Sequence, residues 1–194
     1  RSMQQAPSYR DVVGEVATFL QDRVAACQSV GLPAEQIAPH LASFPGVVHR
    51  QERVATHKNL TIINDSKATN AEASLHALRA FPNMFWLLGG QAKEEGIAPL
   101  LGDVAGVRQA YTFGQAAAEF TAQLSPIVGT RQIETLEQAL SLALEDALDW
   151  ANQHPEEPVT LVLSPACASF DQFSSFEARG YAFKALARQA VAAL

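Results

Sequence analysis

A carboxylate, an ammonium group and two hydroxyls fall close together in residues 64–70, which read NDSKATN. Asp65 has the chemistry to accept hydrogen bonds from a ribose diol. Lys67, with the start of a following helix, could face a phosphate or a carboxylate. The alternative interpretation is that Asp65 or Ser66 only caps that helix. Spacing alone leaves both interpretations open.

Two further turns carry polar groups that a fold does not require. In residues 89–93 (GGQAK), paired glycines would let the backbone approach a ligand, and Lys93 would offer a charge to a carboxylate; a plain turn with a solvated lysine is the alternative. In residues 164–173 (SPACASFDQF), Ser169 and the following backbone N–H groups could hold an anionic oxygen, or Ser169 could cap a helix.

The remaining reactive side chains give weaker signals. Arg50, which follows His49, could bind a phosphate through two hydrogen bonds. Alternatively, His49 and Arg50 could be ordinary surface residues without a function. Cys167 has apolar neighbours and no histidine nearby in sequence, which indicates a buried, inert thiol. The other histidines lack metal-ligand spacing, so no metal site is expected in this chain. Neither a Walker A loop nor a dinucleotide-binding G-x-G-x-x-G occurs.

The elements that must position these groups alternate between strands and helices. Strands are predicted over 60–63, 85–88, 109–113 and 159–163, with a weaker candidate over 126–133. Helices are predicted over 71–80, 115–123, 136–152 and 173–194. Such alternation predicts an α/β fold with an open, mostly parallel sheet and helices on both faces. Each polar turn follows a strand, where such sheets bind ligands.

The chain ahead of His49 has a different pattern. Apolar residues recur at helical spacing from Asp11, a Gly-Leu-Pro stop follows at residues 31–33, and a short helix is expected over 34–41. Phe44-Pro45-Gly46 then breaks the pattern. We therefore expect an N-terminal helical segment over 1–48 and a second domain over 49–194.

Composition limits the class of protein. The 194 residues are 48% hydrophobic, which is too high for a disordered chain, and the net charge of −6 (14 basic against 20 acidic residues) disfavours a nucleic-acid or anionic-membrane partner. No apolar run reaches 18 residues, and the first residues do not read as a signal peptide. Two cysteines, 27 and 167, do not form a disulfide framework. A cytoplasmic location is expected.

Taken together, the motifs resemble the C-terminal domain of the Mur ligases that add D-glutamate, a Rossmann-like domain. The resemblance covers about Val24–Leu194, whereas residues 1–22 do not match. Gln91-Ala92 departs from the more polar pair typical of that loop. The matching blocks are NDSKATN (64–70), GGxxK (89–93), LSPACAS (163–169), His49-Arg50, DQF (171–173) and FExRG (176–180).

The resemblance implies an ATP-dependent amide ligation in peptidoglycan synthesis. The carboxylate of UDP-N-acetylmuramoyl-L-alanine takes the γ-phosphoryl group of ATP, with Mg²⁺ screening the charges, and the amine of D-glutamate attacks the acyl phosphate. The residues implied at the nucleotide are Arg50 at the phosphates, Asp65 at the ribose, Lys67 nearby, and His49, which could instead only orient the linker. The residues implied at the D-glutamate carboxylates are Thr69, Lys93, Ser169, Phe170 and Phe176. Lys67 is the one candidate for a catalytic role.

The family places two domains ahead of this one, for the UDP-sugar and for ATP hydrolysis. The phosphate-binding loop, the Mg²⁺ ligands and a modified lysine belong to the central ATPase domain, of which residues 1–48 would be partly a remnant. We therefore expect this chain to be inactive alone, with a hinge near residues 44–50. A free-standing nucleotide- or amino-acid-binding module is the alternative, and the missing glycine fingerprint disfavours an NAD-dependent oxidoreductase.

Overall fold

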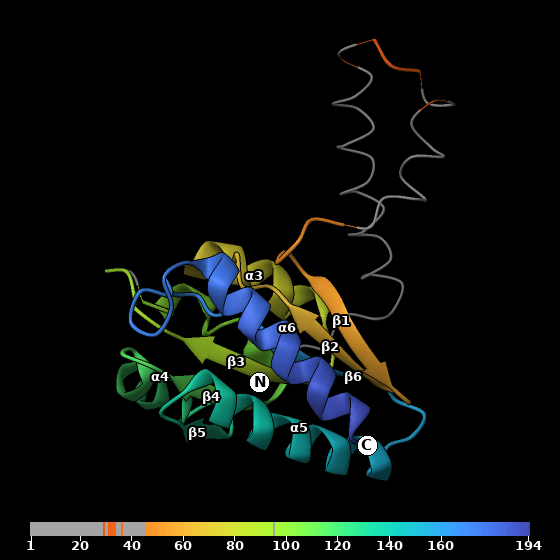
Figure 1. Cartoon of the computed structure of the whole chain (residues 1–194). Helices are drawn as coiled ribbons and strands as arrows, with labels where there is room; N and C mark the ends of the chain where they lie inside the picture. The colour runs from red at the N-terminus through yellow and green to blue at the C-terminus, as the bar shows by residue number, and fades with distance from the viewer. Residues whose placement is uncertain (1–28, 30, 34–35, 37–45, 95) are drawn as a thin grey trace, which may run out of the picture. The chain divides into compact units, whose positions relative to one another are not determined.

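The computed structural model describes residues 29, 31–33, 36, 46–94 and 96–194 (Figure 1). The chain divides into two compact units, Arg1–Gly46 and Val47–Leu194, and the second contains every element described below. The helices expected within residues 11–41 fall almost wholly outside the described residues. None of the described helices is long and apolar enough to cross a membrane.

A six-stranded sheet forms the centre of the second unit. Its strands lie in the order β1-β2-β6-β3-β4-β5, and every neighbouring pair is parallel except β1 with β2. The predicted strands are confirmed, including the weak one, which contains β5. The bounds are β1 Glu52–His57, β2 Leu60–Asn64, β3 Met84–Gly89, β4 Val107–Phe113, β5 Thr130–Gln132 and β6 Val159–Leu163.

The antiparallel edge strand β1 was not predicted from the sequence. Val54 is the only buried residue of this strand, and the polar residues around it break any apolar run. A tight turn at Lys58, whose φ is 52°, returns the chain into β2. The strand therefore forms because β2 offers it a hydrogen-bonding edge, which a pattern of hydrophobicity does not reveal.

Four α-helices cover both faces of the sheet, as predicted (Figure 1). Two helices start later than expected. Helix α4 begins at Ala117 rather than at residue 115, and α6 begins at Phe176, after its N-cap Ser175, rather than at residue 173. The bounds are α3 Ala71–Ala80, α4 Ala117–Leu124, α5 Leu136–Gln153 and α6 Phe176–Ala192, with short 3₁₀ turns η1 Ala98–Leu100 and η2 Val104–Gly106.

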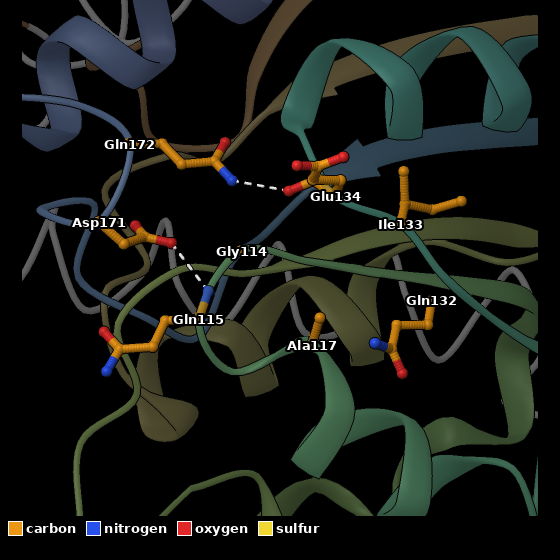
Figure 2. A pocket seen from close by; sticks show the side chains of 8 residues that line it. All are labelled: Gly114, Gln115, Ala117, Gln132, Ile133, Glu134, Asp171 and Gln172. Atoms are coloured by element: carbon orange, nitrogen blue, oxygen red, sulfur yellow. Dashed lines mark hydrogen bonds between the residues drawn. The ribbon is translucent and has the colours of Figure 1, made fainter.

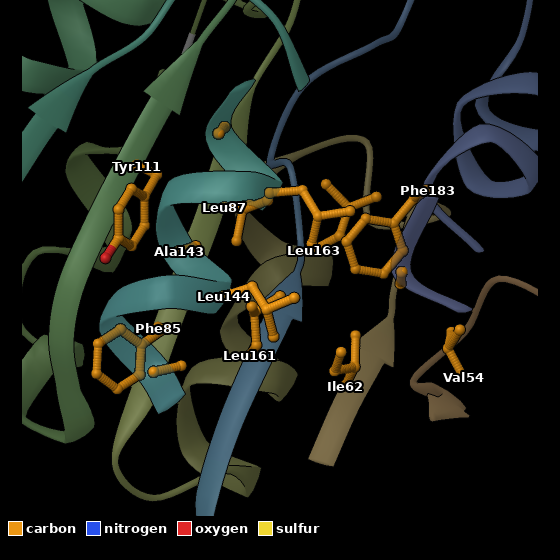
Figure 3. Packing of buried hydrophobic residues seen from close by; sticks show 14 of the residues in the cluster. Val54, Ile62, Phe85, Leu87, Tyr111, Ala143, Leu144, Leu161, Leu163 and Phe183 are labelled. Carbon is orange, nitrogen blue, oxygen red and sulfur yellow. The ribbon is translucent and has the colours of Figure 1, made fainter. Parts of the chain in front are cut away.

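Alternate residues of the strands enter two separate cores. Phe85 and Leu87 of β3 belong to the core that α5 and α6 cover, to which Leu144 of α5 and Phe183 of α6 also contribute (Figure 3). Trp86, between them in sequence, points to the opposite face with the residues of α3 and α4. Both cores together fix the strands in register, so that the strand ends lie at one edge of the sheet.

Candidate ligand site at the carboxyl ends of the strands

The three polar turns predicted from the sequence follow three neighbouring strands. Residues 64–70 follow β2, residues 164–173 follow β6, and residues 89–93 follow β3, and the sheet order is β2-β6-β3. The third turn along the chain therefore lies between the other two. Parallel strands place their carboxyl ends at the same edge, so the sheet gathers all three turns at one site.

Asp65 holds the first turn to its surroundings. It is 4% exposed, and its carboxylate accepts hydrogen bonds from the backbone N–H of Gln51 (3.1 Å) and from the hydroxyl of Ser164 (2.9 Å). The suggestion that Asp65 or Ser66 caps the following helix is wrong, because the side chain of Asn70 caps α3 by accepting from Ala73 N–H at 2.8 Å. The Asp65 side chain therefore does not cap a helix, and instead joins the turn after β2 to Gln51 and to Ser164.

Burial changes the pKa of Asp65. Removal from water raises the pKa of its carboxyl to about 6, and the hydrogen bonds from Ser164 and Gln51, with the charge of Arg50, oppose that rise only in part. A carboxylate that is kept nearly dry at this cost is typical of a functional site.

His49 and Arg50 sit on a tight turn with opposite exposures. The backbone of His49 has a φ of 64°, and its ring is 2% exposed, with Nδ1 lying 2.9 Å from the Asn64 amide nitrogen. Its carbonyl accepts from Lys67 N–H at 3.0 Å. Burial lowers the pKa of the imidazole, against the opposing charge of Glu52. The exposed Arg50 is therefore carried by a firmly held turn beside Asp65.

The paired glycines serve backbone packing rather than open space for a ligand. Gly89 and Gly90 have φ values of 139° and 123°, and a Cβ on Gly89 would lie 1.9 Å from the carbonyl oxygen of Phe113. A Cβ on Gly90 would lie 2.3 Å from the carbonyl oxygen of Ala168. The turn is therefore pressed against its neighbours, and Lys93 at its end is exposed.

Ser169 is the most informative residue of the third turn. It is 1% exposed, and its hydroxyl is without a hydrogen-bond partner among the described atoms. It does not cap a helix, because Ser175 caps α6. Buried hydroxyls are nearly always paired, so this unpaired one has a hydrogen bond still to give, and a ligand oxygen is one group that could accept it. Cys167, by contrast, is buried with its thiol pKa raised to about 12, which agrees with the predicted inert thiol.

Some of the expected ligand residues are in contact and others are not. The Lys67 ammonium lies 5.9 Å from the centre of the Phe176 ring, and that ring lies 6.3 Å from His49. Gln91 pairs with Ala168, which places the turn of Lys93 beside that of Ser169. Phe170 is 69% exposed. Thr69 is half-buried, and the structure records no side-chain contact that joins it to the others.

Ser66 and Arg179 are important here, although the sequence suggested only a helix-capping role for Ser66 and no role for Arg179. The Ser66 hydroxyl donates to the Phe176 carbonyl at 2.8 Å and accepts from Arg179 Nε at 3.0 Å. Arg179 is completely buried. A positive residue in the first turn of a helix, where the dipole opposes it, was the available sequence signal.

An open pocket of about 520 Å³ lies at the ends of β4 and β5, and Asp171 and Gln172 of the turn after β6 line part of it (Figure 2). Gln172 crosses it to donate to the Glu134 carbonyl at 2.8 Å, and Asp171 accepts from Gln115 N–H at 3.0 Å. No lysine or arginine lines it, and it contains none of the expected ligand residues. Its carboxylates make it a poor site for an anion. Among the described residues, no cluster of His, Cys, Asp or Glu could hold a metal.

Comparisons with known proteins agree with this fold. Residues 49–163 match the family described as Mur ligase, glutamate ligase domain. The chain is 45% identical over 171 residues to the UDP-N-acetylmuramoylalanine–D-glutamate ligase of Mesorhizobium japonicum, covering 88% of this chain and 35% of that one. It is 48% identical over 162 residues to the same-named ligase of Brucella abortus, covering 83% and 34%.

The structure resembles that of UDP-N-acetylmuramate-alanine ligase from Thermotoga maritima. The TM-score is 0.53 at 16% identity, over 95% of this chain and 39% of the other, which is a likeness of fold alone. The chain belongs to the Mur ligase family. Within that family its resemblance to the C-terminal domain of the D-glutamate-adding ligases is confirmed. It spans about a third of the length of those relatives.

Proposed function

We propose that the chain is the ligand-closing domain of an ATP-dependent ligase that adds D-glutamate to UDP-N-acetylmuramoyl-L-alanine in peptidoglycan synthesis. The observation that carries the proposal is the gathering of three polar turns at neighbouring strand ends, where the buried hydroxyl of Ser169 lacks a partner. The similarity to D-glutamate ligases supports the same function.

At the nucleotide end, Arg50 would pair with phosphate oxygens and Asp65 would accept from the ribose. The two oxygens of Asp65 each use one hydrogen bond within the protein, so each keeps a lone pair for a further donor. His49 would orient this contact rather than make it, because its ring is buried. Lys67 lies on the same turn, exposed, and is the candidate for stabilising charge as the acyl phosphate reacts.

At the amino-acid end, cations and neutral donors would hold the two carboxylates of D-glutamate. Lys93 supplies a charge, Ser169 and Thr69 supply hydroxyls, and the first backbone N–H of α6, that of Phe176, is one that a helix leaves free. Phe170 would form an exposed aromatic wall. These groups come from separate strand ends, as recognition of a dianion with two distant charges requires.

ATP chemistry would depend on parts outside this chain. The sequence contains no Walker A loop, so the phosphate-binding loop and the Mg²⁺ ligands would belong to a central domain, and the UDP-sugar to an N-terminal one. Mg²⁺ would screen the phosphate charges during transfer. The chain's own residues would bind and orient the adenosine end of ATP and D-glutamate.

Calorimetric titration of the chain with ADP and with D-glutamate tests the binding roles, with L-glutamate as the control for stereochemistry. We expect both ligands to bind and L-glutamate to bind at least tenfold more weakly. Absence of binding for both ligands, or equal affinity for the two enantiomers, would overturn the proposal.

An ADP-release assay with UDP-N-acetylmuramoyl-L-alanine, D-glutamate and Mg-ATP tests the expected inactivity of the isolated chain. We expect no turnover by this chain alone. Turnover should appear when residues 49–194 replace the matching third of the Brucella abortus relative. Turnover by the chain alone would refute the inactivity, and an inactive, folded chimera would count against the assigned family role.

A further inference from the structure

Arg179 occupies a position that electrostatics alone would not favour. It is the fourth residue of α6, whose first turn carries the positive end of the helix dipole, and it is completely buried. Among the described residues, no carboxylate forms an ion pair with it. Burying an unpaired charge is costly, so the hydrogen bonds of the guanidinium must account for its presence.

Those hydrogen bonds join two of the three polar turns to α6. Arg179 Nε donates to the Ser66 hydroxyl at 3.0 Å, and Nη2 donates to the Ser66 carbonyl at 2.9 Å. The same Nη2 donates to the Cys167 carbonyl at 3.0 Å. Thr69 lies three residues after Ser66, and Ser169 lies two residues after Cys167, so one planar group bonds to the turns that carry two of the residues expected at the D-glutamate carboxylates.

The guanidinium also lies close to the turn after β3. Its Nη1 has no acceptor among the described atoms and lies 3.2 Å from the place where a Cβ on Gly90 would stand. Burial lowers the pKa of Arg179 to about 10, so the group stays charged at neutral pH and all of its N–H groups remain donors. Arg179 therefore lies where the turns after β2, β6 and β3 meet.

We propose that Arg179 is a positioning residue that holds the turns after β2 and β6 at the spacing needed for one dicarboxylate ligand. The inference rests on the proposed function, because D-glutamate is the ligand whose two carboxylates the turns would share. A rigid fork with several donors can set the separation of two loops, whereas a lysine ammonium on a flexible stem cannot fix it as closely. Misplacement of a binding group by about 1 Å is enough to impair a site.

Two variants of the 194-residue chain test the effect on ligands. Arg179→Met should weaken D-glutamate binding at least tenfold and ADP binding less than threefold, because Asp65 is held by Gln51 and Ser164 instead. Arg179→Lys should recover part of the lost affinity. Arg131→Met, which removes an arginine paired with Asp146 away from the three turns, is the matched control and should change neither affinity. Equal losses for both ligands, or unchanged D-glutamate affinity, would overturn the positioning role.

Amide hydrogen exchange separates this inference from the proposed function. Lys67 N–H is bonded to the His49 carbonyl and Ala168 N–H to the Gln91 carbonyl, both at 3.0 Å. Arg179→Met should speed exchange at both amides at least tenfold and leave Leu144 in α5 unchanged. If Arg179→Met does not fold, the comparison uses Arg179→Lys. Unchanged exchange in Arg179→Met would refute the positioning role. If exchange is faster in Arg179→Met but the wild-type chain does not bind D-glutamate, the positioning role is supported and D-glutamate is not the ligand.

Discussion

The ring of His49 occupies the space that a side chain on Gly180 would need. A Cβ built on Gly180 would lie 2.2 Å from His49 Nδ1. This contact joins the middle of α6 to the turn that carries Arg50, and it explains why a glycine interrupts a helix that is otherwise rich in alanine. Glycine lowers the stability of a helix, but at position 180 it leaves the space that the His49 imidazole occupies.

Gly180→Ala should therefore destabilise the protein although alanine favours helices by about 1 kcal/mol over glycine. Displacing the His49 ring from Asn64 should cost about 1–3 kcal/mol, so a net loss is expected in urea unfolding. The double variant His49→Ala/Gly180→Ala is the control, because it removes the clash. If the double variant is as unstable as the sum of the single changes, the two residues do not compete for the same space.

Asp65→Asn should make the chain more stable at pH 8. Burial raises the Asp65 pKa from 3.8 to about 6, so folding favours the protonated carboxyl. Its stabilising contribution is full below about pH 4 and is lost as the pH rises through 6. The neutral amide avoids this loss, and the gain at pH 8 should reach up to about 3 kcal/mol. Urea unfolding at pH 8, 6 and 4 measures it, and a gain that does not shrink toward pH 4 would contradict the stated cause.

Two serines of the same turn should respond in opposite ways. Ser164→Ala removes a buried donor to Asp65 and should cost about 1–3 kcal/mol of stability. Ser169→Ala removes a buried hydroxyl without a partner, so stability should stay within about 0.5 kcal/mol or rise. Thermal melting compares the two variants. A large loss of stability in Ser169→Ala would mean that the hydroxyl is bonded within the protein.

Under the proposed function, Ser169→Ala should also weaken D-glutamate binding by about tenfold or more, because hydrogen bonds to charged groups contribute about 1.5–3 kcal/mol. ADP binding is the internal control and should be unchanged. Unchanged D-glutamate affinity would remove Ser169 from the ligand site.

Substitution of Lys93 and substitution of Asp65 should each weaken the binding of only one of the two ligands. Lys93→Met removes an exposed charge and should weaken D-glutamate at least tenfold with little effect on ADP, whereas Asp65→Asn should do the reverse. Calorimetry on both variants with both ligands gives the four affinities required. If both variants weaken both ligands equally, the roles assigned to these two residues are incorrect.

Much of the fold could be predicted because short apolar runs that end at turn residues, such as Phe85–Leu88 before Gly89, are typical of buried strands. The polar turns after them could be located for the same reason. The sheet order could not, since nothing local places β6 between β2 and β3. The edge strand β1 was missed because Val54 alone reaches the core.

Helix caps and buried polar partners were harder to predict. Asn70 and Ser175, rather than Asp65 and Ser169, cap their helices, and several Ser, Thr, Asn or Asp residues ahead of each helix made the choice ambiguous in sequence. The partners of Asp65 and Arg179 lie 12 to 113 positions away in the sequence, so only the folded chain brings them together.

The two edges of the sheet bear on how the chain behaves at high concentration. An open row of backbone N–H and C=O groups is a template for aggregation, and neither edge offers a long, flat one. Strand β5 is only three residues long and polar, while β1 is irregular between Arg53 and Ala55 and carries charged side chains. The sheet described here is therefore protected against edge-to-edge association.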